Sequence, residues 1–206
     1  MNRKIKDIIY HYPLFFPRLY AFLRFLILPI AKIEQYIPKE GNILDIGCGY
    51  GLTSFYLALN SSKRFVLGLE LNQNRVILAS KINHLKNLRF QTANLTGNIK
   101  KTFDVILAVD LLHHLSKSDQ MKFFIDASKL TKSGKLLIIK DINRKFVFGY
   151  FWNFVHDLLI PRSFQLNYLT SETIIGTAKI TGFSLMETHH LDNFFYPHIL
   201  YVFKKQ

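Results

Sequence analysis

The chain has 206 residues, 49% of them apolar, which is enough to build the hydrophobic core of one domain of ordinary size. Its formal net charge of +13 favours anionic partners, although the basic residues are scattered in pairs, as on a solvated soluble surface. The single cysteine, Cys48, excludes an intramolecular disulfide framework and a zinc site built from several cysteines, so a cytoplasmic location is expected.

Residues 1–40 precede the first predicted strand, and we expect them to form an N-terminal helical cap. They contain no small-residue cleavage site of the kind that ends a signal peptide. The stretch 15–33, FFPRLYAFLRFLILPIAKI, is apolar, but it lacks the roughly 18 uninterrupted apolar residues of a spanning helix. It is interrupted by Pro17, Arg18, Arg24 and Pro29. A buried or membrane-surface helix is therefore predicted.

From residue 42 onward, apolar runs alternate with segments of helical length. Strands are predicted at 42–46, 64–70, 88–93, 103–109 and 134–141, and helices at 52–59, 74–85 and 118–130. Continuous apolar runs between helices indicate parallel strands that are covered on both faces. Two late strands, 183–191 and 198–205, have no clear helix between them and are expected to pair antiparallel at one edge.

These elements predict an α/β fold. The expected architecture is a Rossmann-like, doubly wound, mostly parallel seven-stranded sheet with an antiparallel edge strand and helices on both faces. Residues 1–206 are expected to form a single domain. Residues 145–170 fall outside the alternation and are rich in aromatic side chains.

The first strand-to-helix turn carries the sequence ILDIGCGYG, residues 43–51. In an open parallel sheet this turn meets the ligand, and its glycines permit dihedral angles and contact distances that a β-carbon would block. A dinucleotide-binding fingerprint would place Gly or Ala three residues after Gly49, where Leu52 stands. An acid, Asp45, instead precedes the first glycine by two residues. A tight structural turn is the alternative.

An acidic residue followed by alternating glycines resembles the first motif of the class I S-adenosylmethionine-dependent methyltransferases. The resemblance covers residues 40–142 and is weaker over 183–205. It implies S-adenosyl-L-methionine as the cofactor, with Asp45 organising the turn and the cofactor's amino group. The residues that it places against the methionine and ribose portions are Gly47, Cys48, Gly49 and Gly51.

A second acid, Glu70, ends the second predicted strand, where a carboxylate can accept two hydrogen bonds from a ribose diol. The alternative is a solvated strand-end acid. The resemblance also assigns Leu71 to the cofactor site. It places Asn94 and Leu95 near the adenine; Asn94 stands where the family often has an aspartate, and its amide can both donate to and accept from a base edge.

The segment FDVILAVDLLHHL resembles the fourth motif of the same family. Asp110 either contacts the cofactor or substrate or caps the turn after the strand. His113 is the candidate general base, whereas His114 is expected to be structural. Asp110, Asp141 and Asn143 loosely resemble the magnesium site of catechol methyltransferases, but Asn143 is displaced by one residue, so no metal is expected.

The acceptor is expected to be a small hydrophobic molecule, phenolic or lipid-like. No Asn/Asp-Pro-Pro-aromatic sequence follows the fourth strand, which is atypical of base amino-methyltransferases and makes nucleic acid an unfavoured partner. In this fold, residues 145–170 are expected to form an aromatic lid. Together with the apolar N-terminal stretch and the basic charge, this lid favours peripheral contact with an anionic membrane. Ordinary core packing by these aromatics remains the alternative.

The C-terminal FFYPHILYVFKK weakly resembles small bacterial methyltransferases of polyketide, aryl-polyene or lipid pathways. Two other functions stay open. The charge favours an RNA methyltransferase, and a catalytically silent cofactor-fold module could bind a membrane surface. The sequence predicts no oligomeric state.

Overall fold

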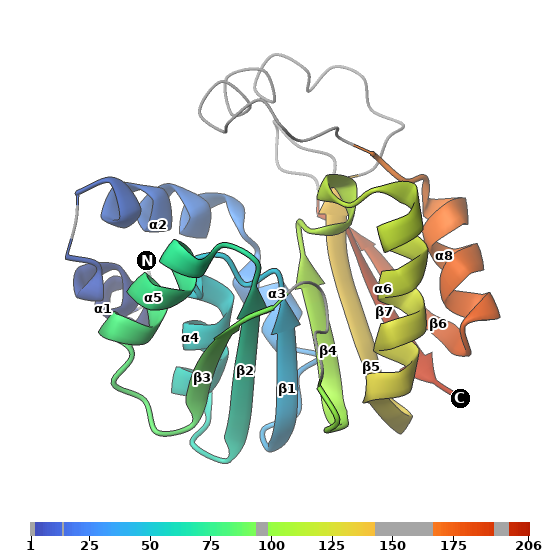
Figure 1. The fold of residues 1–206 in the computed structure, drawn as a ribbon, viewed down its shortest axis with the longest axis horizontal. Coiled ribbons are helices and arrows are strands. Elements are labelled where there is room, and N and C mark those ends of the chain that lie inside the picture. Colours follow the sequence, from blue (N-terminus) through green and yellow to red (C-terminus); the bar gives the residue numbers. More distant parts are fainter. Residues whose placement is uncertain (1–2, 14, 94–98, 143–166, 192–197) are drawn as a thin grey trace. The chain divides into compact units, whose positions relative to one another are not determined.

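The computed structural model describes residues 3–13, 15–93, 99–142, 167–191 and 198–206 (Figure 1). Its seven strands are hydrogen-bonded in the order β3-β2-β1-β4-β5-β7-β6. They are β1 Gly41–Ile46, β2 Arg64–Glu70, β3 Leu88–Thr92, β4 Phe103–Val109, β5 Thr131–Ile142, β6 Phe183–His190 and β7 His198–Lys205. The predicted α/β fold with a mostly parallel seven-stranded sheet is confirmed.

The predicted antiparallel pair at one edge is also confirmed. Strand β7 pairs antiparallel with both β5 and β6, so it is the strand that runs against the others, and β6 is the outermost strand at that edge. The observed bounds of β2, β4 and β7 coincide with the predicted ones, because each apolar run is closed by polar residues.

The chain is organised as two compact units, Met1–Leu107 and Ala108–Gln206. In the first unit, α4 Leu52–Asn60 and α5 Gln73–Ile82 connect the parallel strands β1, β2 and β3 and pack against β2 and β3. The side chain of Asn72 caps α5 by accepting from the backbone N–H groups of Asn74 and Arg75. The expected single domain stays a prediction.

The N-terminal segment of the first unit is helical. It forms α1 Arg3–His11, α2 Phe15–Ile27 and α3 Ile30–Glu34, with Pro29 between the last two. The fully buried guanidinium of Arg64 fixes α3 to the sheet, because it pairs with Glu34 at 2.8 Å and donates to the carbonyls of Ile37 and Leu57. Within the described ranges, no helix is both long and apolar enough to cross a membrane.

The second unit contains α6 Lys117–Leu130 and α8 Ser171–Ile180, which lie side by side (Figure 1). Helix α8 was not predicted, because residues 170–182 combine few apolar residues with two glycines. The sequence marks only the start of this helix, with the N-cap residue Thr170, whose side chain accepts from the backbone N–H of Thr173. The larger part of the predicted lid, residues 145–166, lies outside the described residues.

Candidate active site

The glycine turn after β1 is held against the end of β2. The backbone N–H groups of Gly47 and Cys48 both donate to the carbonyl of Leu69, at 2.8 and 2.9 Å. Strands β1 and β2 run parallel with Ile46 opposite Leu69, so the turn begins where β2 reaches Glu70. The two predicted acidic positions therefore belong to one local structure at the carboxyl ends of adjacent strands.

Two glycines of the turn are required for different reasons. Gly51 has φ +83°, and a β-carbon there would lie 2.5 Å from the Phe90 ring, so packing excludes any side chain. Gly49 has φ +57°, which disfavours other residues, yet a β-carbon there would meet no atom within 4 Å. The space beside Gly49 is thus open, as expected where a ligand approaches the backbone closely.

The carboxylate of Glu70 points into this turn. Its Oε2 accepts from the Gly49 N–H at 2.9 Å and its Oε1 accepts from the Asn72 N–H at 2.8 Å, while Arg75 lies 4.0 Å away. Glu70 is only 9% exposed, so it is no freely solvated strand-end acid. Each oxygen keeps lone pairs for a further donor such as a ribose hydroxyl. The next residue, Leu71, is 61% exposed and offers an apolar surface beside the carboxylate.

Asp45 lies beneath the turn, fully buried, and joins β1 to α4. Its Oδ2 accepts from the Ser54 hydroxyl at 2.5 Å. Burial raises the pKa of Asp45 to about 6, with a smaller contribution from the charge of Glu70, while the Ser54 hydrogen bond opposes the rise. This geometry suits the predicted organising role. Burial likewise raises the pKa of the Cys48 thiol well above its usual value, which disfavours the thiolate form.

The N-terminal segment contacts the glycine turn through two tyrosines, one between α1 and α2 and one in α2. The buried Tyr12 hydroxyl donates to the Tyr50 carbonyl at 2.5 Å, and the Tyr20 ring of α2 packs edge-on against the Tyr50 ring at 5.3 Å. The Arg75 guanidinium lies over the same ring at 5.3 Å. These contacts are not predictable from the sequence, because single tyrosines form no recognisable motif.

The second unit contains a buried histidine–aspartate pair after β4. The Nδ1 atom of His113 lies 2.5 Å from Oδ1 of Asp141, whose carboxylate also accepts from the N–H groups of Leu112 and Ile142. Tyr168 stacks on the His113 ring at 5.7 Å. No described residue hydrogen-bonds the other ring nitrogen, Nε2. A pair of this kind fixes the tautomer and leaves Nε2 to exchange a proton.

The charge of Asp141 decides the protonation behaviour of His113. Burial alone would lower the pKa of His113, but the adjacent Asp141 carboxylate and its hydrogen bond outweigh burial and raise it above the ordinary value. The neighbouring His114 contacts the His113 ring at 4.0 Å. From the sequence, the only expectation for Asp141 is its loose resemblance to a magnesium ligand. Its position at the end of a strand was the available signal for the pairing.

Asp110 adopts φ 52° and forms an ion pair that its sequence motif does not predict. Its carboxylate accepts from the fully buried Nζ of Lys140 at 2.7 and 2.9 Å, and Nε2 of His198 lies 3.6 Å away. A lysine inside the apolar strand LLIIKDI was the signal, since a buried charge requires a partner. Asp110 therefore contributes to a buried ion-pair cluster.

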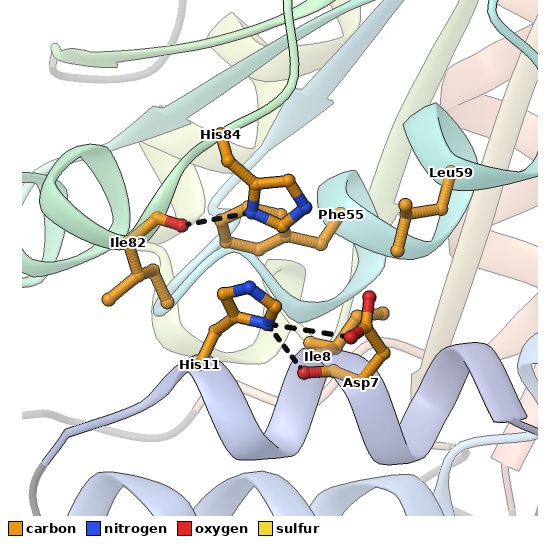
Figure 2. Close-up of a pocket in the computed structure, with 7 residues that line it drawn as sticks. All are labelled: Asp7, Ile8, His11, Phe55, Leu59, Ile82 and His84. Carbon is orange, nitrogen blue, oxygen red and sulfur yellow. Dashed lines mark hydrogen bonds and ion pairs between the residues drawn. The ribbon is translucent and has the colours of Figure 1, made fainter.

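Three predicted residues, Asn94, Leu95 and Asn143, lie outside the described residues. Across the described ranges, no group of three His, Cys, Asp or Glu side chains is placed to hold a metal. A shallow hollow in the first unit is shown in Figure 2, where the His11 and His84 rings stack at 4.3 Å. It is lined by Asp7, Ile8, His11, Phe55, Leu59, Ile82 and His84. None of the predicted site residues lines it.

Comparison with known proteins shows which proteins this chain resembles. Residues 43–134 match the family described as "Methyltransferase domain". The chain is 29% identical over 185 residues to the mitochondrial ubiquinone biosynthesis O-methyltransferase of Dictyostelium discoideum, covering 82% of this chain and 50% of the relative. It is 31% identical over 124 residues to the ubiquinone biosynthesis O-methyltransferase of Coxiella burnetii, covering 57% of this chain and 50% of that relative. The chain thus spans about half the length of these curated relatives.

The fold is shared with solved methyltransferase structures. Magnesium protoporphyrin IX methyltransferase from Synechocystis PCC 6803, solved with bound S-adenosylhomocysteine, superposes with a TM-score of 0.69 at 18% identity, covering 86% of this chain and 82% of that one. At this identity the superposition shows that the overall fold is shared. The methyltransferase domain over residues 43–134, the methyltransferase relatives and the shared fold together support a class I S-adenosylmethionine-dependent methyltransferase, the family that the glycine motif of this chain resembles.

Proposed function

We propose that the protein transfers a methyl group from S-adenosyl-L-methionine to the hydroxyl of a small apolar, phenolic or lipid-like acceptor. The observation that carries this proposal is the joining of the glycine turn to Glu70, whose carboxylate accepts from the Gly49 N–H at 2.9 Å. The relatives named ubiquinone biosynthesis O-methyltransferases support transfer of the methyl group to an oxygen atom.

The residues of the first unit fit the cofactor. The open space at Gly49 admits a ligand against the backbone, the remaining lone pairs of Glu70 suit a ribose diol, and exposed Leu71 suits the face of an adenine. We assign Gly47, Cys48 and Gly51 to the part of the turn that lies against the cofactor. We assign Asp45 the role of holding the turn in place through its hydrogen bond with Ser54. Bound S-adenosyl-L-methionine supplies a methyl group that its sulfonium already activates. The chain's own task is to orient the acceptor and exclude water.

We assign the role of general base to His113. Its Nε2 takes the proton of the acceptor hydroxyl, while Asp141 holds Nδ1–H and stabilises the imidazolium that forms. The buried ion pair between Asp110 and Lys140 maintains the end of β4 from which His113 follows. A base of this kind is needed only when the acceptor is not already ionised.

Methyl transfer is tested directly with labelled S-adenosyl-L-methionine and a panel of phenols and polyprenylated phenols, with an RNA pool as a competing acceptor class. We expect label in the phenolic products and none in RNA. Label that enters RNA with a steep salt dependence would favour the alternative function that the net charge suggests. Cofactor binding without turnover on any acceptor would favour a catalytically silent module.

Replacing Gly49 by alanine is expected to weaken S-adenosylhomocysteine binding about 30-fold or more, because a methyl group would fill the space that a ligand needs. Gly134→Ala is the matched control: Gly134 also has positive φ, at 74°, and open space, but lies outside the site. Both variants should lose about 1 kcal/mol of unfolding free energy. Equal calorimetric affinity in the two variants would contradict a cofactor contact at Gly49.

We further propose that the protein acts in the cytoplasm and reaches its apolar acceptor at a membrane surface. The support is the apolar N-terminal helix α2 together with the net charge of +13. The predicted lid over 145–170 remains part of this proposal.

A further inference from the structure

Helix α2 presents a large apolar face to solvent. Ala21 and Phe25 are buried against the first unit, whereas three phenylalanines and three leucines of the same helix are exposed. We call these side chains the α2 face: Phe15, Phe16, Leu19, Phe22, Leu23 and Leu26. At about 100° of rotation per residue they occupy one arc of the helix that no charged residue interrupts. A contiguous apolar arc with three phenylalanines marks an interaction site.

The charges around the α2 face identify its partner. Helices α1 and α2, which pack together, carry five Lys or Arg residues and a single acidic residue, Asp7. An apolar arc within a basic surface is complementary to an anionic bilayer, where apolar side chains enter the headgroup boundary and cations meet phosphates. A second copy of the chain is a poorer partner, because the basic residues of the two copies would repel each other.

The length of α2 fits the plane of a membrane. Its 13 residues extend about 20 Å, less than the roughly 30 Å of a hydrocarbon core. Beside the α2 face, the helix is joined to the glycine turn, since Tyr20 packs against Tyr50. A helix that lies along the bilayer would therefore hold the proposed cofactor turn close to the membrane surface.

We propose that the α2 face docks the protein onto an anionic lipid bilayer. The purpose of docking, access to an acceptor dissolved in the membrane, rests on the proposed function. The docking itself follows from the exposed apolar arc and the surrounding basic residues.

The test is co-sedimentation of the full chain with two kinds of vesicle. One kind contains phosphatidylcholine only, and the other contains phosphatidylcholine with about 30 mol% of the anionic lipid phosphatidylglycerol. The double variant Phe16→Ser/Leu23→Ser should bind anionic vesicles about 100-fold more weakly. The matched control is Ile77→Ser/Ile180→Ser, which removes two exposed apolar side chains elsewhere and should bind normally. Pure phosphatidylcholine should bind the unaltered chain at least about 10-fold more weakly.

Each outcome separates this inference from the proposed function. Equal vesicle binding by both double variants would overturn the docking role of α2, even if S-adenosylhomocysteine binding and turnover of a soluble phenol are intact. Vesicle binding without turnover would preserve docking and count against the enzyme. A lipid-independent dimer that the α2 variant dissociates would overturn the membrane as the partner. A clear loss of urea stability in that variant would show that the chain itself covers the α2 face.

Discussion

Replacing Glu70 by alanine is expected to weaken S-adenosylhomocysteine binding at least about 100-fold while the protein remains folded. Glu70 is the one carboxylate that contacts the glycine turn among the described residues, through the Gly49 N–H. The variant loses the proposed charge-assisted hydrogen bonds to the ribose diol, each worth about 1.5–3 kcal/mol. It also frees the N–H groups of Gly49 and Asn72. Calorimetric titration measures the change in affinity.

Two further variants separate ligand binding from support of the turn. Glu70→Gln keeps one acceptor oxygen and nearly the same shape, so an intermediate loss of about 10-fold is expected. Glu40→Ala removes an exposed carboxylate from the same unit and should leave affinity unchanged. The assignment would be wrong if Glu70→Ala, shown to be folded by urea titration, bound S-adenosylhomocysteine within about twofold of the unaltered chain.

The second large effect is expected at His113. His113→Gln should lower kcat on a weakly acidic phenol by about 10²- to 10⁴-fold, the usual contribution of a general base, and leave S-adenosylhomocysteine affinity unchanged. A phenol that is already ionised at the assay pH needs no base, so with that acceptor the deficit should largely disappear. His190→Gln, an exposed histidine of the same unit, is the control. An equal loss with both phenols would indicate a structural role for His113.

The pH profile tests Asp141 as the positioning residue. A base works in its neutral form, and Asp141 raises the pKa of His113, so kcat/KM should rise with pH through a pKa above 6.5. Asp141→Asn removes the negative charge but keeps an acceptor oxygen. In this variant the rise of kcat/KM with pH should occur at lower pH, and kcat should fall roughly 10-fold. If kcat/KM rose at the same pH in this variant, a group other than His113 would be titrating.

The sequence predicted the sheet because each strand is a local apolar run. Strands β2, β4 and β7 have the predicted bounds, and the acid-glycine motif identified the turn after β1 from nine consecutive residues. Helix α8 escaped prediction because its few apolar residues give weak periodicity, and only the cap at Thr170 marks its start.

The chemistry of the second unit could not be predicted in the same way, because its partners are distant in sequence. His113 is paired with Asp141, 28 residues away, and Asp110 with Lys140, 30 residues away. Such pairs depend on which strands become neighbours, and local patterns do not contain that information. The connection of Tyr12 to the glycine turn, across 38 residues, has the same origin.

Calorimetric titration of the unaltered protein with S-adenosylhomocysteine, with NAD as the control ligand, tests the central claim most directly. The open turn at Gly49 and the carboxylate of Glu70 predict one site with a dissociation constant on the order of micromolar, about −8 kcal/mol, and no heat with NAD. Absence of binding in protein shown to be folded would make the glycine turn a structural feature and contradict the methyltransferase assignment.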